Sequence, residues 1–226
     1  LIEASRWDLR EQLMNEKLAL GFYRSGHPFS AVAEEFSQFA RTPLGKIQQP
    51  SPSEPPREQV LAGVVESMRV QKTGSGRMMI LVLSDGTGKQ EITVYDEVLD
   101  AHRNAIREDA VVIVQAKVRS FRRGGDAEGD VQMRIVAEKI YDIAAARSRF
   151  GRMLRLSMNG AADARRLKDL LGPYRNGSLP VSVSYCNNRA EADFDLGEAW
   201  KIRPEDNLIA DLGKWLDPKN VQVVYS

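Results

Sequence analysis

The sequence is poor in the residues that form disulfides, metal sites and membrane spans. It has one cysteine and two histidines in 226 residues, which excludes an internal disulfide and a cysteine-based zinc site. A single cysteine is typical of the reducing cytoplasm. No apolar run reaches the length of a membrane span, and no signal peptide is recognisable. We therefore predict a cytoplasmic protein with no membrane partner.

Neither sign of charge is in excess. The 32 Lys and Arg residues and the 31 Asp and Glu residues give a net charge of +1. A dedicated binder of duplex DNA would have a strongly basic surface, so any contact with nucleic acid should be local and modest. The length fits one or two ordinary domains. Because the first residue is Leu rather than Met, we expect a piece of a longer polypeptide.

The sequence does contain a set of strand-like segments between residues 58 and 143. They are rich in Val, Ile, Met and Leu and are bounded by Gly, Asp, Asn or Ser. The predicted strands are residues 60–71, 77–84, 89–95, 110–121 and 131–140, with one helix at residues 96–107. This order is expected of an OB-fold, a five-stranded Greek-key barrel that often binds oligonucleotides.

The fourth of these strands has the clearest alternation of side chains. Its small apolar residues should point into the barrel: Val112, Val114, Ala116 and Val118. Its other residues should point outward: Gln115, Lys117, Arg119 and Phe121. Cations beside an aromatic ring suit single-stranded nucleic acid, because cations follow phosphates and rings stack on bases. A solvated exterior is the alternative, since OB-folds also bind saccharides and proteins.

We extend this face to cationic and aromatic residues of the neighbouring strands and the following turn. The predicted nucleic-acid-binding residues are Arg69, Lys72, Arg77, Tyr95, Lys117, Arg119, Phe121, Arg122 and Arg123.

Two helical patterns and a proline-rich segment precede the barrel. Residues 6–23 and 31–39 have apolar stripes at helical spacing, but two such helices cannot build a core alone. Residues 1–40 are therefore predicted to be the helical end of a preceding domain, with His27 in a structural role. Residues 41–57 hold five of the ten prolines, which predicts a semi-rigid linker.

A short basic bridge at residues 144–151 follows the barrel, and residues 152–226 then predict a small α/β domain of order β-α-β-β-α-β. The predicted strands are residues 152–158, 179–185, 189–196 and 221–225, with residues 200–202 also extended; the helices are residues 161–171 and 204–216. Pro204 is placed at the first position of the second helix. The whole chain is thus predicted to be an α+β multidomain protein: a helical N-terminal remnant, an OB-fold barrel and a C-terminal α/β domain.

The last domain has more large apolar residues than so small a unit can comfortably bury. Because Trp and Tyr often anchor protein–protein contacts, we predict a docking surface here, with simple core packing as the alternative. The predicted partner-binding residues are Trp200, Lys201, Leu208, Leu212, Trp215 and Leu216.

Evidence for catalysis in the sequence is weak. Glu191, Asp193 and Asp195 alternate on one strand face, and paired carboxylates hold the metal ions of nucleotidyl transfer. The further carboxylates and the phosphate-binding group that such a site needs are not recognisable, so a solvated acidic face is the alternative. Cys186 has no adjacent His and is predicted to be buried rather than nucleophilic. We predict no catalytic residue, metal site or cofactor in this chain.

Three segments together resemble the C-terminal region of the bacterial, replicative DNA polymerase III alpha subunit family. Near the start is EKLALGFYRSGHPFSAVAEEF, similar to the segment that closes the helix-hairpin-helix region of that family. The barrel contributes VLAGVV, an L-x-D-x-(T/S)-G turn at residues 83–88, and DAVVIVQAKV. The end contributes GSLPVSVSY and LGEAWKIRPEDNLIADL. The resemblance covers nearly the whole chain, in the family's order.

The resemblance implies a non-catalytic role for this region of a DNA-directed DNA polymerase. The polymerase active site, with its Mg²⁺, would lie upstream of this chain. The barrel would bind the single-stranded DNA template, and the last domain would dock the tau subunit of the clamp loader. The family's sliding-clamp motif would lie just before residue 1, since Gln12-Leu13-Met14 does not match it. The acidic strand at residues 191–195 and the long, mixed-charge hairpin at residues 121–130 depart from the family pattern.

Two other functions remain open on the sequence. One is an RNA-binding OB module, like the anticodon-binding domain of a class II aminoacyl-tRNA synthetase, which leaves the helical start and the α/β end unexplained. The other is a metal-dependent nuclease or nucleotidyltransferase centred on Asp193 and Asp195.

Overall fold

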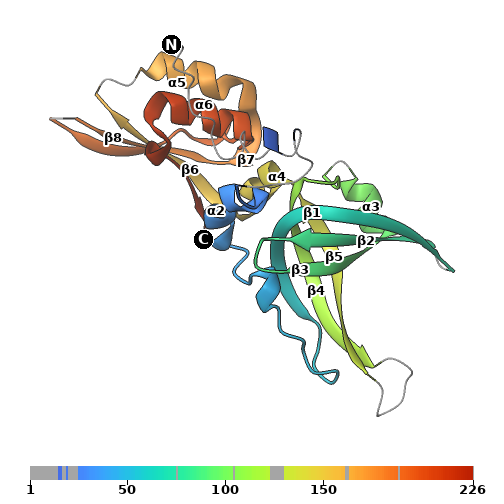
Figure 1. Cartoon of the computed structure of the whole chain (residues 1–226). Coiled ribbons are helices and arrows are strands. Elements are labelled where there is room, and N and C mark those ends of the chain that lie inside the picture. The colour runs from blue at the N-terminus through green and yellow to red at the C-terminus, as the bar shows by residue number, and fades with distance from the viewer. Residues whose placement is uncertain are drawn as a thin grey trace. The chain divides into compact units, whose positions relative to one another are not determined.

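The computed structural model contains a β-barrel and a separate four-stranded sheet (Figure 1). It describes residues 15, 16, 19, 25–74, 76–103, 105–122, 130–160, 163–187 and 189–225. The chain divides into two units, Leu1–Ile140 and Tyr141–Ser226. The prediction of an α+β chain with an OB-type barrel and a small α/β unit is confirmed. The helix predicted at residues 6–23 falls almost entirely outside the described residues.

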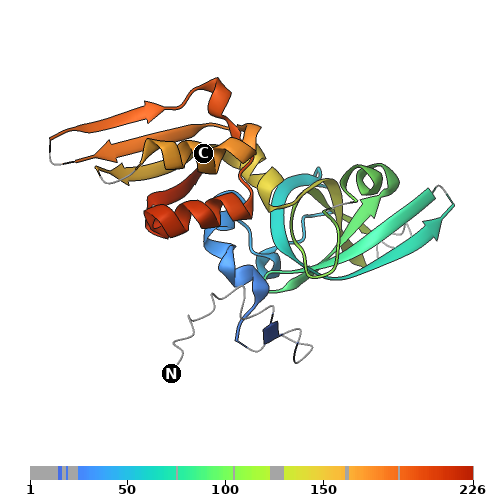
Figure 2. The same cartoon turned by 90° about the horizontal axis from the view of Figure 1, so that it is seen from above.

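Five strands close the barrel in the order β1-β2-β3-β5-β4, seen end-on in Figure 2. They are β1 (Arg57–Thr73), β2 (Gly76–Ser84), β3 (Lys89–Tyr95), β4 (Val111–Arg122) and β5 (Val131–Tyr141). A helix, α3 (Asp96–His102), joins β3 to β4 and is shorter than predicted. The long strand β1 pairs with β4 through its first half and with β2 through its second half. A register shift between Val65 and Ser67 separates the two halves, as expected for a bulge that bends a strand around a barrel.

Alternating apolar side chains fill the barrel. Leu61, Leu81, Ile92 and Val114 have no exposed surface, and Ile135 is 2% exposed. Burying each side chain of this size contributes about 1.5–3 kcal/mol relative to leaving it in water. The predicted inward residues of the fourth strand are all fully buried: Val112, Val114, Ala116 and Val118. The alternation that predicted the outer face is therefore correct.

The start of the proline-rich segment is part of the barrel rather than a free linker. Leu44, in a short 3₁₀ helix at Leu44–Lys46, is completely buried in the barrel core. Its N–H donates to Asp85 Oδ2 (2.8 Å), and its carbonyl accepts from Gln90 Nε2 (3.0 Å). This corrects the prediction of a linker over residues 41–57, because its first residues cover the barrel core.

The predicted L-x-D-x-(T/S)-G turn explains how this segment is held. Asp85 Oδ1 accepts from the N–H and hydroxyl of Thr87 (2.8 and 2.7 Å) and from the N–H of Gly88 (3.2 Å). A Cβ at Gly88 would lie 2.6 Å from Gly45 Cα, so only glycine allows the turn and the segment to approach so closely. Burial raises the pKa of Asp85, but the hydrogen bonds from Leu44, Thr87 and Gly88 lower that pKa by more, to below its ordinary 3.8.

The second predicted helix, residues 31–39, is divided into a 3₁₀ helix (Pro28–Ala31) and α2 (Ala33–Ser37). Phe36 is fully buried, and its ring contacts those of Phe29 and Phe39. His27 Nδ1 accepts from the Phe29 N–H (3.2 Å), and Nε2 lies 3.1 Å from Ser84 Oγ. These contacts give His27 a helix-capping, structural position.

The second unit is a four-stranded sheet of order β10-β6-β8-β9, with α5 and α6 on one face (Figures 1 and 2). Its elements are α4 (Ile143–Phe150), β6 (Gly151–Asn159), α5 (Ala164–Leu171), β7 (Arg175–Leu179), β8 (Val181–Cys186), β9 (Glu191–Asp195), α6 (Asp206–Leu216) and β10 (Val221–Tyr225). β6 and β8 are parallel, and the other neighbours are antiparallel. No helix in the described part of the chain is long and apolar enough to cross a membrane.

Several predicted elements of this unit need correction. The basic bridge at residues 144–151 is helix α4, whose N-terminus is capped by Asp142, which accepts from the Ala145 N–H (2.7 Å). Of residues 200–202, which were predicted to be extended, Trp200 instead ends a 3₁₀ helix at Glu198–Trp200, whereas Ile202 forms antiparallel bridges with Arg175 and Leu179. Strand β7 was not predicted.

Pro204 does not begin α6, and its carbonyl is held by a residue outside the helix. The helix begins at Asp206, two residues later than predicted. The carbonyl of Pro204 accepts from the buried Arg147 (3.3 Å), and Arg147 also pairs with Asp206 (2.7 Å).

Candidate nucleic-acid interface

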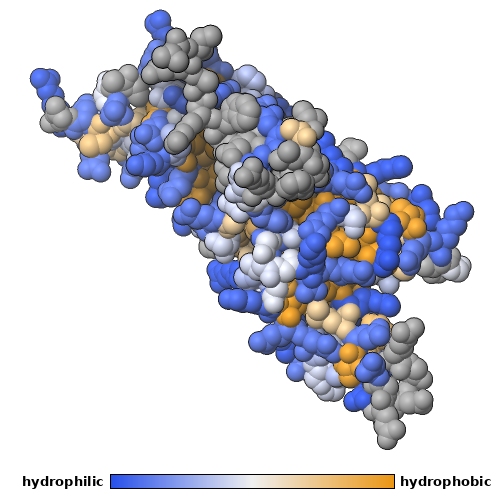
Figure 3. Space-filling view, in the orientation of Figure 1, coloured by the Kyte–Doolittle hydropathy of each residue, from blue (hydrophilic) through white to orange (hydrophobic). Residues whose placement is uncertain are grey.

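The outward side chains of the second half of β1 and of β2, β3, β5 and β4 form what we call the outer face of the barrel. One row crosses it, in which Arg69 lies opposite Ile80, Ile80 opposite Thr93, and Thr93 opposite Val136. In the next row Met78 lies opposite Tyr95, which is 41% exposed. Figure 3 shows hydrophobic side chains among charged ones over the β1–β2–β3 side of the barrel. A partly apolar floor with charged surroundings can stack bases and contact phosphates.

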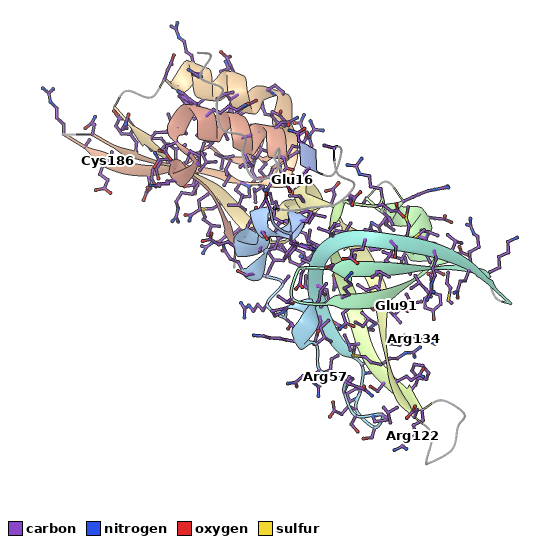
Figure 4. The ribbon with its side chains drawn as sticks, in the orientation of Figure 1. Glu16, Arg57, Glu91, Arg122, Arg134 and Cys186 are labelled. Atoms are coloured by element: carbon purple, nitrogen blue, oxygen red, sulfur yellow. The ribbon has the colours of Figure 1, made fainter. Side chains whose placement is uncertain are left out.

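The most informative contact on the outer face joins Phe121 and Arg134. Phe121 is half-buried on β4, and the Arg134 guanidinium of β5 lies 4.7 Å from the centre of its ring. Arg134 was not among the predicted residues. The signal for it is the alternation in β5, where Met133 and Ile135 pack in the barrel core and leave Arg134 outside. Figure 4 labels Arg134 and Glu91 on neighbouring strands of this side.

Lys117 points outward, as predicted, but its charge is already matched. It forms an ion pair with Glu138 of β5, and Glu58 of β1 lies directly opposite it on its other side. The hydrogen bond with Glu138, together with the charge of that carboxylate, raises the pKa of the Lys117 ammonium. Exposed pairs of this kind add little stability. Their consequence here is that Lys117 offers little uncompensated charge to a phosphate.

The predicted cations of the β1–β2 hairpin are also partly neutralised by carboxylates. Arg69 pairs with Glu91 (3.3 Å), and Arg77 pairs with Asp96 (3.1 Å) and Asp100 (3.6 Å). The outer face is therefore charged but close to neutral over much of its area.

The remaining predicted cations lie on exposed positions or outside the described residues. Arg119 is exposed, and among the described residues no carboxylate forms an ion pair with it. Lys72 is exposed near the tip of the hairpin, opposite Arg77. Arg122 is exposed at the end of β4, and Arg123 falls outside the described residues. Arg119 thus lies two residues before Phe121 on the outward side of β4, and the Phe121 ring contacts Arg134.

The predicted docking residues of the second unit separate into core and surface. Leu208 and Leu212 are completely buried in its core, so their prediction as partner contacts is corrected. Trp200 is half-buried beneath the guanidinium of Arg175 (4.5 Å to the ring centre). Lys201 pairs with Glu198 at 2.7 Å.

Trp215 and Leu216 are also only half-buried, near the end of α6. The Arg166 guanidinium lies 5.5 Å from the centre of the Trp215 ring. Two tryptophans of this unit therefore keep part of their surface in contact with solvent.

The carboxylates of β9 lack the surroundings of a two-metal site. Glu191, Asp193 and Asp195 are all exposed, and the described residues contain no group of three or more His, Cys, Asp or Glu placed to hold a metal ion. Cys186 is exposed at the end of β8 (Figure 4), which corrects the prediction that it is buried.

These features define a class of protein, namely an OB-fold barrel with a charged, partly aromatic outer face, followed by a small α/β unit. Comparison with protein families gives one match in the barrel and one in the second unit. Residues 59–143 match the family described as OB-fold nucleic acid binding domain. Residues 166–216 match the family described as DNA polymerase III subunit alpha, C-terminal domain.

Relatives align over nearly the whole chain. DNA polymerase III subunit alpha of Neisseria meningitidis serogroup A is 31% identical over 228 residues, covering 99% of this chain and 19% of the relative. The same subunit of Vibrio cholerae is 28% identical with the same coverage, and that of Escherichia coli K12 is 28% identical over 97% of the chain. The chain therefore belongs to the DNA polymerase III alpha subunit family, as a segment of its C-terminal region. It spans about a fifth of the length of these relatives.

Two solved structures show a distant likeness to part of the chain. The mitochondrial single-stranded DNA binding protein Rim1 from S. cerevisiae has a TM-score of 0.32 and 18% identity, over 40% of this chain and 97% of its own. The single-stranded DNA binding protein from Thermus aquaticus has the same TM-score and 15% identity, over 40% of this chain and 52% of its own.

Proposed function

We propose that this chain is the non-catalytic C-terminal part of a replicative DNA polymerase III alpha subunit, acting in DNA replication in the cytoplasm. Its barrel binds the single-stranded DNA template, and its second unit docks the tau subunit of the clamp loader. The nucleotidyl transfer of the parent polymerase, with its Mg²⁺, belongs to a part of the polypeptide outside this chain. Family matches to both units, in the order found here, support this proposal.

The observation that carries the DNA-binding half is the Phe121–Arg134 contact beside Arg119. An aromatic ring and a guanidinium both present flat surfaces on which any base can stack, so such a site does not depend on sequence. Arg119 can contact a phosphate of the same strand. Because Lys117, Arg69 and Arg77 are matched by carboxylates, few phosphates gain a new partner. We therefore expect micromolar binding with a shallow dependence on salt.

A titration of the protein into a labelled single strand tests this half. The strand should be about 16 nucleotides long, the upper range for one OB-fold, and fluorescence anisotropy reports the bound fraction. The double variant Phe121→Ala/Arg134→Ala should bind at least about tenfold more weakly. Arg175→Ala is the matched control, because it breaks a similar cation–π contact with Trp200 in the other unit.

Two results would contradict the DNA-binding half. Equal binding by the double variant and the wild type would exclude the outer face as the site. A preference of about tenfold or more for transfer RNA over single-stranded DNA would instead favour the anticodon-binding-type alternative.

The docking half is supported by the half-buried Trp200 and Trp215, which lie within the matched segment, residues 166–216. Partly exposed tryptophans are common anchors of protein–protein interfaces. Hydrogen exchange measured with and without the tau subunit should show new protection within residues 191–216. Protection confined to the barrel would refute docking through this unit.

A further inference from the structure

Strand β9 is an edge of the sheet in the second unit. It pairs with β8 on one side and ends the strand order β10-β6-β8-β9. All of its residues are exposed, including Phe194, which is 46% exposed. An exposed edge strand presents backbone groups to which another strand can bind.

The hydrogen bonds that flank β9 show which backbone groups face the open edge. The Leu196 N–H donates to the Val181 carbonyl (2.9 Å), and the Asn187 N–H donates to the Ala190 carbonyl (2.9 Å). Directly hydrogen-bonded pairs alternate along an antiparallel ladder. The N–H and carbonyl groups of Glu191, Asp193 and Asp195 therefore point away from β8, toward the open edge.

The two faces of β9 differ in chemistry. Phe194 lies opposite Val183, on the face that carries the core, whereas Asp193 lies opposite Ser184 on the other face. The side chains of Glu191 and Asp195 share the face of Asp193, since they alternate along the strand. Within the described residues none of the three carboxylates makes an ion pair, so this face carries uncompensated negative charge.

An apolar pocket of about 350 Å³ lies beside Phe194. Leu167 and Lys168 of α5 form one side of it, and Tyr185, Phe194 and Trp200 also line it. Lys168 is the single charged residue among its lining residues. The volume is suited to bulky apolar side chains, and Phe194 of the edge strand is among the residues that line the pocket.

We propose that β9 accepts an extended segment of a partner protein as an added strand. In that segment basic and apolar side chains alternate. The backbone of residues 191, 193 and 195 supplies the hydrogen bonds, as in other cases of strand addition. Apolar side chains of the segment enter the pocket beside Phe194, and its basic side chains, on the other face, meet the carboxylates of β9. This inference rests on the proposal that the second unit docks a partner.

A pair of peptides tests whether binding requires basic and apolar side chains to alternate along the bound segment. The probe is a labelled heptapeptide of sequence Lys-Leu-Lys-Phe-Lys-Leu-Lys, and its control has the same residues in blocks, Lys-Lys-Lys-Lys-Leu-Phe-Leu. Charge and hydrophobicity are equal, so only strand alternation differs. We expect the alternating probe to bind the wild-type chain at least about tenfold more tightly in fluorescence anisotropy, a difference of about 1.4 kcal/mol.

Two variants at Asp193 separate the contribution of its backbone N–H from that of its side chain. Asp193→Pro removes an N–H that faces the open edge and leaves the β8–β9 hydrogen bonds intact, as proline on an edge strand does. It should abolish selective binding of the probe. Asp193→Ala is the matched control, which keeps the N–H and loses one carboxylate, so its binding should fall only a few-fold. Equal binding of the two peptides to the wild type, or unchanged binding by Asp193→Pro, would overturn the proposal.

A charge exchange keeps the test decisive if Asp193→Pro lowers the thermal midpoint. Asp193→Lys/Asp195→Lys should lose the lysine probe and gain an alternating probe with Glu in place of Lys. Failure to exchange preference would overturn the proposal. Titration of the tau subunit keeps the two proposals apart. A wild-type chain that does not bind tau contradicts the proposed docking, whereas tau binding unaffected by Asp193→Pro or Phe194→Ala contradicts only the strand-addition site.

Discussion

The guanidinium of Arg134 lies 4.7 Å from the centre of the Phe121 ring, and the two residues come from neighbouring strands, β5 and β4. The barrel fixes this contact through the register of its strands, so the two flat groups are already positioned before a ligand arrives. Little ordering is then needed when a base stacks on them.

The flatness of these two groups, rather than charge alone, should decide affinity for single-stranded DNA. Phe121→Ala should weaken binding by about 1–3 kcal/mol, the usual value of one stacked base. Arg134→Lys keeps the charge but loses the planar group, and should weaken binding in the same direction by less. Anisotropy titrations measure both. If Arg134→Lys binds like the wild type, the guanidinium acts only as a charge.

Lys117 should contribute little to DNA binding while Glu138 remains. Lys117→Ala should change affinity by less than about twofold, because the wild-type ammonium is already paired. Glu138→Gln should raise affinity, and should steepen the slope of log K against log salt by about 0.7, the value for one added phosphate contact. A titration series over salt concentration measures both. Weaker binding by Glu138→Gln would show that the carboxylate itself contacts the ligand.

Leu44 should anchor the barrel although it lies in a proline-rich segment. Leu44→Ala should lower the free energy of unfolding of the barrel unit by about 2–5 kcal/mol, as for other fully buried leucines. Pro52→Ala is the control, because Pro52 is exposed in the same segment and should change stability by less than about 0.5 kcal/mol. Urea unfolding followed by circular dichroism measures the difference. Equal effects of the two variants would mean that the segment is not held by Leu44.

Asp85 should make the stability of the barrel depend on acid pH. Its pKa in the folded protein lies below the ordinary 3.8, so the unfolded chain takes up its proton first as pH falls. Its contribution is therefore complete above pH 3.8 and is lost as pH falls through the lower, folded value. Wild type should be more stable than Asp85→Asn near neutral pH, and the difference should shrink below about pH 4. A difference that is constant across this range would contradict the assignment.

The barrel could be predicted from sequence because its strands alternate clearly. The range of β3 was predicted in full, and Val112 to Val118 take the predicted faces. What the sequence could not give is which carboxylates lie beside each cation. Glu58 and Glu138 are distant from Lys117 in sequence and are brought to it by strand pairing. The proline content of residues 41–57 likewise gave no sign that Leu44 is buried in the barrel, because proline content indicates backbone stiffness and not long-range contacts.

In the second unit, the sequence pattern could not distinguish residues of the core from residues of a docking surface. Leu208 and Leu212 give the same apolar stripe whether a sheet of the same chain or another protein covers it. Helix α4 could have been recognised from Asp142, a good N-cap residue three positions before Ala145. The basic residues of that stretch favoured a bridge instead.

The glutamates beside Lys117 and Arg69 give the barrel surface counterions of its own. When a single strand of DNA crosses such a surface, its phosphates replace the glutamates as partners of the cations, and few dissolved ions are displaced. Each exchange is nearly balanced in free energy, so a strand held there could advance one nucleotide at a time against little resistance. For a barrel proposed to act beside a moving polymerase, binding that lets the DNA move in this way would be more useful than tight binding.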